Sequence, residues 1–467
     1  MNYWDSILKT NVYEAWEFME KTIDSVDMVA IGGGLAGLAT AALVARSGKS
    51  VALYEQSSNE IGGRARTLVH DGYFFNQGPH ALFLADAGAR LLQELEISYT
   101  GGIPSATSFE IRDVKNHRLL VNGSSDSTTQ ASESGPGKVF AQLTGLLNKS
   151  DFAELESVSV QEWIDRNFHD SDSIELMKAL IRLTTYANDP DIQSAGSALH
   201  QFHVYNQGGV MYLDRGWQTL VAGLVEAAKN AGARIDVGKK ASKVQKSGSG
   251  WLVALSDNSQ ISAKVLVIAV GGPHEAEALF REGEKPEALS KAVNESKPVR
   301  MVCLDVALSS LPQKDMMFAL GIDSPLYFSV HSASAELAPP NGALIHVAKY
   351  LGTSIKPNPR EDGKELEELL DLLQPGWREV VVKKRPLPSM VVTNALPVAS
   401  SGGLSGRPAP RIDDGLYIVG DWVGSEGLLS NASLASARRA AQEIQNELAS
   451  DYGVSGQKSS ISDSVAS

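Results

Sequence analysis

The sequence predicts an α/β fold, with a doubly wound parallel sheet and an inserted α+β domain of helices packed on a second sheet. Three observations carry this prediction. Residues 26–55 have the pattern of a strand, a glycine-rich turn, a helix and a second strand. The fully apolar run Val265–Val270 is typical of a strand buried on both faces of a parallel sheet. The run Gly415–Asp421 again predicts a strand, and a helix rich in small residues follows it.

Composition and charge exclude several classes of protein. The chain has 467 residues, of which 43% are hydrophobic and 21% are charged, as in an ordinary globular protein. The formal net charge of −13 gives no general attraction to nucleic acid, so we expect no nucleic-acid partner. The single cysteine, Cys303, can form no intrachain disulfide and no cysteine-rich zinc site. We expect a buried, inert thiol and no metal site.

Residues 1–26 precede the first clear strand, and we expect a helical extension there. Apolar residues such as Trp4, Ile7 and Leu8 recur in it at roughly helical spacing. The chain has no apolar stretch of about 20 residues, so we expect no transmembrane segment. The first residues also lack the basic and apolar regions of a secretory signal, and we expect a cytoplasmic location. The sequence does not decide whether the protein makes peripheral contact with a membrane.

The first unit of the sheet is predicted from three consecutive segments. Val26–Ile31 is a short strand, Leu38–Arg46 is an alanine-rich helix that ends before Gly48, and Val51–Glu55 is the next strand. A unit of this kind places its two strands side by side in parallel, with a right-handed crossover.

The turn of this unit fits the pattern G-x-G-x-x-G and indicates a Rossmann-like dinucleotide site. Gly32 permits the tight turn, Gly34 lets a pyrophosphate approach the backbone, and Gly37 lets the helix pack closely on the strand. The phosphates are expected on the free N–H groups at the positive end of the helix, where Leu35 and Ala36 lie.

Glu55 ends the second strand, 18 residues after Gly37. A carboxylate at this place can accept hydrogen bonds from both ribose hydroxyls of a dinucleotide. Its charge also disfavours the 2′-phosphate of NADP by repulsion. The alternative is a solvated strand end without a ligand, but the complete strand–helix–strand unit favours the ribose role.

A second glycine pair and an arginine follow directly, within Glu60–Thr67. With them, the sequence resembles the flavin amine oxidase and phytoene desaturase superfamily, whose members share the glycine-rich turn, an acidic residue and then G-G-R-x-x-T. The resemblance implies FAD rather than NAD as the cofactor, with Gly62, Gly63 and Arg64 along its pyrophosphate and ribityl chain. No cysteine or histidine stands where we expect a covalent link, so FAD is expected to bind non-covalently.

The resemblance continues through Asp71–His80, which is similar to the family segment beside the flavin ring. It implies that Gly78, Pro79 and His80 lie at the flavin. His80 is our only candidate for a catalytic or flavin-tuning residue, and a structural hydrogen bond to nearby backbone is the alternative. Asn76 stands where aspartate is common in the family, and we assign it no role.

The C-terminal motif is also similar to that of the family. The resemblance implies that Gly420 and Asp421 lie at the ribityl or pyrophosphate region, and that the helix start at Asn431 and Ala432 presents N–H groups to the flavin. The family pattern G-A-x-x-S-G is absent before this helix, so the amide that faces the flavin stays open. Ala241, which follows two lysines, is expected near the adenine.

These patterns predict how the chain divides into domains. The expected FAD-binding domain is discontinuous and comprises residues 27–100, 204–290 and 405–450. The expected substrate-binding domain comprises residues 101–203 and 291–404. Residues 451–467 are rich in serine and are expected to form a flexible tail. Longer helices are predicted over 173–186, 217–229, 361–373 and 430–448, and further strands over 232–237, 300–307, 343–348 and 379–383.

The resemblance implies a FAD-dependent oxidoreductase that oxidises or desaturates a small organic substrate, either polyene-like or an amine, by hydride transfer to flavin N5. Two alternatives stay open: a flavoprotein isomerase without net redox, and a non-catalytic lipid or prenyl carrier of the same fold. The intact set of Gly34, Glu55, Gly63 and Asp421 argues against the carrier. The sequence does not identify the electron acceptor (oxygen, a quinone or another protein) or the oligomeric state.

Overall fold

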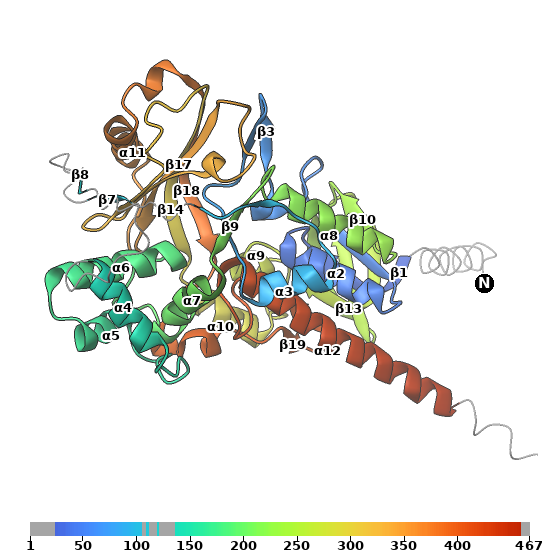
Figure 1. Ribbon diagram of the computed structural model, residues 1–467. Coiled ribbons are helices and arrows are strands. Elements are labelled where there is room, and N and C mark those ends of the chain that lie inside the picture. Colours follow the sequence, from blue (N-terminus) through green and yellow to red (C-terminus); the bar gives the residue numbers. More distant parts are fainter. Residues whose placement is uncertain (1–23, 105–108, 112–118, 121–135, 459–467) are drawn as a thin grey trace, which may run out of the picture.

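The computed structural model describes residues 24–104, 109–111, 119–120 and 136–458. Residues 1–23 of the expected N-terminal extension and the end of the expected tail lie outside the described residues. Two large sheets, two small ones and the helices around them make up the described chain (Figure 1). None of the described helices is long and apolar enough to span a membrane.

The first sheet has eight strands in the order β10-β2-β1-β13-β12-β11, with β20 and β19 attached beside β13. Strand β1 (Asp24–Ile31) lies in parallel between β2 (Val51–Glu55) and β13 (Gln260–Ile268). Strand β20 (Leu416–Ile418) pairs in parallel with the second half of β13. The other strands are β10 (Arg234–Val237), β11 (Ala241–Ser247), β12 (Gly250–Leu255) and β19 (Arg411–Asp413). The predicted doubly wound α/β sheet is therefore confirmed, and its strands come from three separate stretches of the chain.

Helices cover both faces of this sheet. On one face, α2 (Leu35–Arg46) packs against α8 (Gln218–Asn230) and α12 (Leu429–Lys458), and α3 (Ala87–Glu94) joins them. Every residue of α2 except the last is buried, which its alanine content permits. The short helices α9 (Pro273–Glu277) and α10 (Glu287–Glu295) pack on the other face.

Helix α12 extends beyond the predicted end at residue 448. It continues to Lys458. The tail that was expected from residue 451 therefore begins inside a helix.

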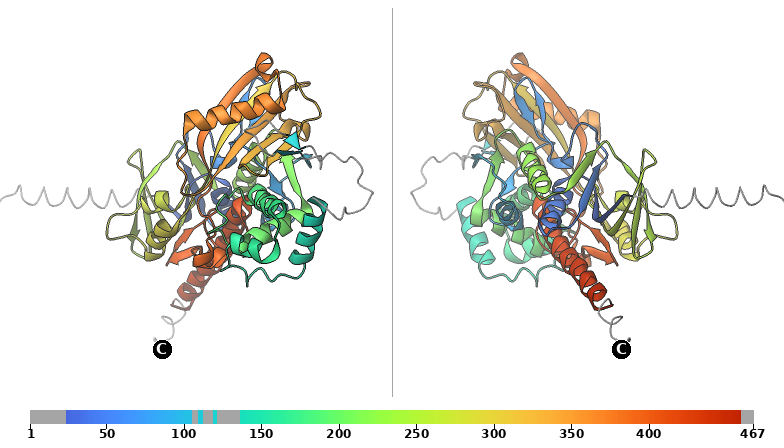
Figure 2. Two further views of the ribbon diagram at one scale, coloured as in Figure 1. Left: turned by 90° about the vertical axis from the view of Figure 1, so that its left-hand side faces the viewer. Right: turned by 90° about the vertical axis from the view of Figure 1, so that its right-hand side faces the viewer.

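The second sheet has seven strands in the order β18-β14-β17-β16-β15-β7-β8. Helix α11 (Pro359–Leu373) packs on one face of it through Leu366, Leu369 and Leu370. Figure 2 shows this sheet and α11, in orange and yellow, standing over one end of the first sheet. Its strands are β7 (Phe109–Ile111), β8 (Leu119–Leu120), β14 (Val299–Leu308), β15 (Phe318–Gly321), β16 (Leu326–Val330), β17 (Ala343–Leu351) and β18 (Val381–Thr393).

A group of helices and several short strands complete the described chain. The helices share an apolar core with β15 of the second sheet and the residue that follows it. They are α4 (Pro136–Leu147), α5 (Val160–Asn167), α6 (Ser171–Thr185) and α7 (Ala195–Gly208). The short strands are β3 (Leu68–His70), β4 (Tyr73–Phe75), β5 (Leu82–Phe83), β6 (Gly101–Gly102) and β9 (Val210–Leu213). The domain boundaries given above stay a prediction.

Candidate cofactor site

The first glycine turn joins β1 to α2 in a conformation that needs glycine at two positions. Gly32 has a φ of +110°, and a Cβ there would lie closer than 3.0 Å to the carbonyl oxygen of Ala269. A Cβ on Gly37 would lie equally close to the carbonyl oxygen of Gly32. Both contacts are with backbone, so a side chain at either position would push α2 away from the sheet.

Open space lies beside the third glycine of the turn. A Cβ on Gly34 would meet no atom within 4 Å. Gly34 precedes α2, whose first amides, from Leu35 and Ala36 onward, receive no side-chain cap, and the first turn of the helix contains no acidic residue. Gly62 forms a parallel bridge with Gly34, and a Cβ on Gly63 would lie 3.6 Å from the Gly34 Cα. The two glycine turns therefore form a cradle that side chains would fill, and the free helix end fits a pyrophosphate group.

Glu55 lies at the end of β2 and turns its carboxylate back to the glycine turn. Oε2 accepts a hydrogen bond from the Gly33 amide at 2.8 Å, and Oε1 accepts one from the Ser57 amide at 2.8 Å. Each carboxylate oxygen keeps capacity for a further donor, such as a ribose hydroxyl. The Lys239 amide donates to the Glu55 carbonyl, which brings the start of β11 at Ala241 toward this strand end.

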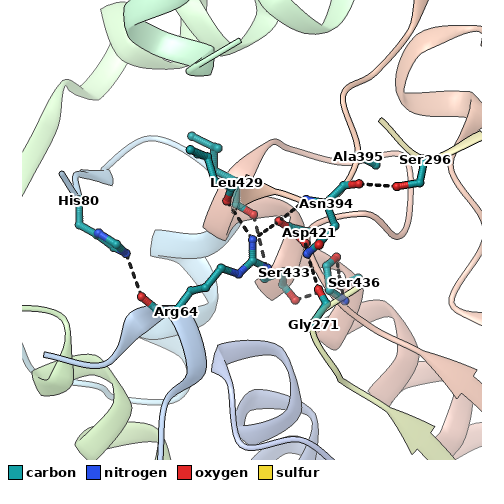
Figure 3. Close-up of polar contacts among 12 residues, drawn as sticks. Arg64, His80, Gly271, Ser296, Asn394, Ala395, Asp421, Leu429, Ser433 and Ser436 are labelled. Carbon is teal, nitrogen blue, oxygen red and sulfur yellow. Dashed lines mark hydrogen bonds and ion pairs between the residues drawn. The ribbon is translucent and has the colours of Figure 1, made fainter. Parts of the chain in front are cut away.

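The second glycine pair and the C-terminal motif meet in an ion pair. Arg64 Nη1 lies 2.7 Å from Asp421 Oδ2, although the two residues are 357 positions apart in the sequence (Figure 3). The backbone and side-chain amides of Asn394 each donate to the same carboxylate at 3.1 Å. Burial raises the pKa of Asp421, but Arg64 and these donors outweigh it, so the pKa lies below its usual value. The carboxylate is therefore charged at neutral pH.

His80 lies beside this ion pair, at the end of the Gly78-Pro79-His80 segment. Its Nδ1 lies 3.1 Å from the Gly78 carbonyl. Its Nε2 lies 3.1 Å from the Arg64 carbonyl, the contact drawn in Figure 3. Trp217 packs against the ring in an edge-to-face contact, with 5.0 Å between the ring centroids. Burial lowers the pKa of His80 to about 4, so the imidazole is neutral at pH 7. A neutral imidazole has a single N–H, so it donates to one of these two carbonyls at a time. A structural hydrogen bond to nearby backbone, which was the alternative for His80, is therefore present.

The neutral state of His80 predicts a loss of stability in acid. Between its ordinary pKa of 6.5 and the folded value of about 4, the unfolded chain binds a proton that the folded chain does not. Stability should therefore fall as the pH drops through this window, by at most roughly 3 kcal/mol from His80 alone. Urea unfolding at pH 7 and pH 4.5 checks this. The decrease in unfolding free energy from pH 7 to pH 4.5 should be smaller in His80→Gln than in the wild type. An equal decrease in both proteins would contradict the prediction.

The start of α12 holds the remaining predicted residues. Both polar atoms of the Asn431 side chain are buried and have no partner among the described residues, and Ala432 is fully buried beside it. Ser436 Oγ bonds to the backbone of Gly420 at 3.0 and 3.1 Å and fixes the end of β20 on α12. Arg407 donates to the Gly427 carbonyl at 3.0 Å and holds the loop before the helix.

Sequence reasoning missed Asn394 and Arg407, because neither stands in a motif and their partners are set by the fold. It was right about Cys303, which is buried in the second sheet. The structure brings the glycine turns, Glu55, Arg64, His80 and Asp421 together along one continuous path. Ala241 is linked to the far end of this path, at Glu55, only through backbone contacts.

Comparison with known proteins identifies the family. The model of the flavin-containing amine oxidoreductases matches residues 35–304. The chain belongs to this family. Membership implies a flavin cofactor, and the cradle described above fits the pyrophosphate of FAD.

The individual proteins that match do so at low sequence identity. Carotenoid 3,4-desaturase of Haloarcula japonica is 23% identical over 296 residues, which cover 56% of this chain and 58% of the relative, less than two thirds of its length. The structure of cyclohexylamine oxidase from Brevibacterium oxydans matches with a TM-score of 0.68 and 15% identity, over 91% of this chain and 99% of the other. An oxidoreductase from Methanosarcina mazei matches with a TM-score of 0.68 and 18% identity, over 88% of this chain and 99% of the other.

Proposed function

We propose that this protein is an oxidoreductase that binds FAD non-covalently and oxidises a small organic substrate. One observation carries the proposal. The uncapped start of α2 faces the second glycine turn, and Arg64 of that turn reaches Asp421 at the other end of the chain. A free helix N-terminus next to glycines is where a dinucleotide pyrophosphate binds, and Arg64 and Asp421 add a cation and a buried carboxylate beside it.

Each part of the path has a physical role toward FAD. The N–H groups and dipole at the start of α2 stabilise the pyrophosphate, and Glu55 accepts from the ribose hydroxyls. Asp421 accepts from ribityl hydroxyls, and Arg64 balances the charge of Asp421 and of the phosphates. When bound, the flavin supplies the hydride-accepting chemistry. The protein must hold the substrate against it and exclude water.

Two features support non-covalent binding. Burial raises the pKa of the Cys303 thiol well above its usual value, so the thiol is protonated and a poor nucleophile. Both ring nitrogens of His80 lie against backbone carbonyls. We expect acid precipitation to release yellow flavin into the supernatant. Flavin that stays with the precipitated protein would contradict this part of the proposal.

The substrate is proposed to be an amine or a polyene-like compound, because the relatives include a carotenoid desaturase and a cyclohexylamine oxidase. Anaerobic mixing of the yellow protein with amines and polyenes tests the proposal. Bleaching of the flavin band supports net oxidation. Product without bleaching indicates an isomerase, and a protein that holds no flavin even after incubation with FAD indicates a carrier.

Replacing Glu55 by alanine should weaken FAD binding. A hydrogen bond to a charged group contributes about 1.5–3 kcal/mol, so the loss of one ribose bond raises Kd by roughly 10- to 100-fold. Titration of the apoprotein with FAD, followed by flavin fluorescence, measures this. The exposed Glu368 on α11 is a matched control, and Glu368→Ala should bind FAD as the wild type does. An unchanged Kd in Glu55→Ala would contradict the ribose role.

A further inference from the structure

A row of polar side chains crosses the second sheet on the face opposite α11. Asp305 of β14 is paired in register with His346 of β17 and with Arg385 of β18, and Ser329 of β16 is paired with His346. His346 Nδ1 lies 2.6 Å from Asp305 Oδ1, and Arg385 Nε lies 3.1 Å from Asp305 Oδ2. The side chains of Asp305 and His346 are fully buried. The neighbouring residues Leu304 and Val306 face α11, as the alternation of a strand requires.

This row borders the segment that ends at His80. Arg385 donates a hydrogen bond to the Asn76 carbonyl. A Cβ on Gly78 would lie 3.4 Å from the Sγ of Cys303, which precedes Asp305 by two residues and shares its face of the sheet. The charges of His346 and Asp305 both act on the pKa of His80. The row therefore lies next to the loop where the flavin ring is expected.

His346 presents an unmatched nitrogen at this place. Asp305 as the partner of Nδ1 fixes the tautomer, and in the neutral imidazole with a proton on Nδ1 the lone pair is on Nε2. His346 Nε2 is buried and has no partner among the described residues. The ring of His331 packs edge-on against it with 4.3 Å between centroids, and His331 Nδ1 is also buried and unmatched. An unmet buried polar atom destabilises a fold, so these two neighbouring nitrogens would be satisfied by a polar ligand group.

We propose that His346 Nε2 accepts the proton of an N–H or O–H group on the carbon that is oxidised. The substrate class is then an amine or alcohol, R₂CH–XH, and not a hydrocarbon polyene. The X–H bond gives its proton to Nε2, the C–H bond gives hydride to the bound FAD, and C=X forms from the electron pair left on X. Asp305 holds the ring in the required tautomer and stabilises the imidazolium, and Arg385 positions Asp305. This inference rests on the proposed oxidoreductase function and narrows its substrate.

The surroundings of His346 suit this role. Burial lowers the pKa of His331 well below its usual value, so this neighbour is neutral and does not compete for the proton. The Tyr327 hydroxyl lies 3.1 Å from His331 Nε2 and fixes that ring. The titratable or charged groups that face this cluster from the packed elements are Asp305 on β14, Arg385 on β18, Tyr327 on β16, His331 after β16, Tyr212 on β9 and His80 in its loop.

The test compares the wild type with His346→Asn, whose side-chain amide can still donate to Asp305 but has no counterpart of Nε2. FAD content and thermal midpoint are measured first, and both should match the wild type. Anaerobic flavin bleaching is then followed with a panel of primary amines, alcohols and the hydrocarbon lycopene. We expect bleaching by an amine or alcohol, slowed at least about 100-fold in His346→Asn. His70→Asn, at an exposed histidine, should behave as the wild type.

A second readout is independent of turnover. In protein labelled with ¹⁵N-histidine, we expect an Nδ1-protonated histidine with a strongly downfield proton. This signal should vanish in His346→Asn and shift in Asp305→Asn. Bleaching by lycopene alone, bleaching by no amine or alcohol, or an unchanged rate in His346→Asn would each overturn the inference and leave the FAD proposal intact. A wild type without flavin would contradict the FAD proposal itself.

Discussion

Replacing Gly34 by alanine is expected to abolish tight FAD binding while the apoprotein stays folded. Gly34 has φ −79° and ψ 179°, which any residue adopts, and a Cβ there would meet no protein atom within 4 Å. The new methyl group would occupy the space through which a pyrophosphate must approach the start of α2. We expect Kd for FAD to rise at least about 100-fold, or about 3 kcal/mol. The urea unfolding free energy of the apoprotein should change by less than roughly 0.5 kcal/mol.

Gly37→Ala is the matched comparison, because it adds the same methyl group three residues later. There the Cβ would lie closer than 3.0 Å to the Gly32 carbonyl oxygen, and neither backbone can move without shifting α2. We expect this variant to lose about 3 kcal/mol of stability or more. FAD titration and urea unfolding of both apoproteins measure the contrast. Equal destabilisation of the two variants, or normal FAD affinity in Gly34→Ala, would show that the space beside Gly34 is not the pyrophosphate site.

The same contrast shows what the sequence could predict. The roles of the glycines depend on neighbours within one strand–helix–strand unit, so their spacing is enough to predict the turn and the helix start. The position of Glu55 at the end of the second strand follows from the same strand–helix–strand unit. The family resemblance extended this reasoning to Arg64 and Asp421, which lie at opposite ends of the chain.

Other parts of the site depend on contacts that no local pattern shows. Asp305 meets His346 only because β14 and β17 pair in one register, and a slip of one residue would turn the two side chains to opposite faces. Asn394 donates to Asp421 from a loop that carries no motif. The sequence therefore predicted the residues expected along FAD better than the polar row that we infer at the substrate.

Replacing Asp421 by alanine is expected to weaken FAD binding and to destabilise the apoprotein together. Asp421 is 1% exposed, and its loss leaves the Arg64 guanidinium and both Asn394 amides without their acceptor. Breaking a fully buried ion pair costs about 3–5 kcal/mol. The Arg64 side chain is 41% exposed, so we expect a smaller loss of about 2 kcal/mol. Kd for FAD should rise by about 100-fold or more, because the ribityl hydroxyls lose a charged acceptor.

Acid unfolding measures the contribution of the Asp421 charge to stability separately from that of the side chain's shape. The pKa of Asp421 lies below its usual value in the folded protein, so its contribution to stability is present above the unfolded pKa of about 3.9 and is lost as the pH falls through the folded pKa. Asp421→Asn keeps the shape and removes this contribution, so its stability should fall less steeply below pH 4. The exposed Asp414 provides the control, since Asp414→Asn should keep both the FAD affinity and the acid profile of the wild type. If Asp421→Ala instead binds FAD as tightly as Asp414→Asn, the C-terminal motif holds the fold together but does not hold the cofactor.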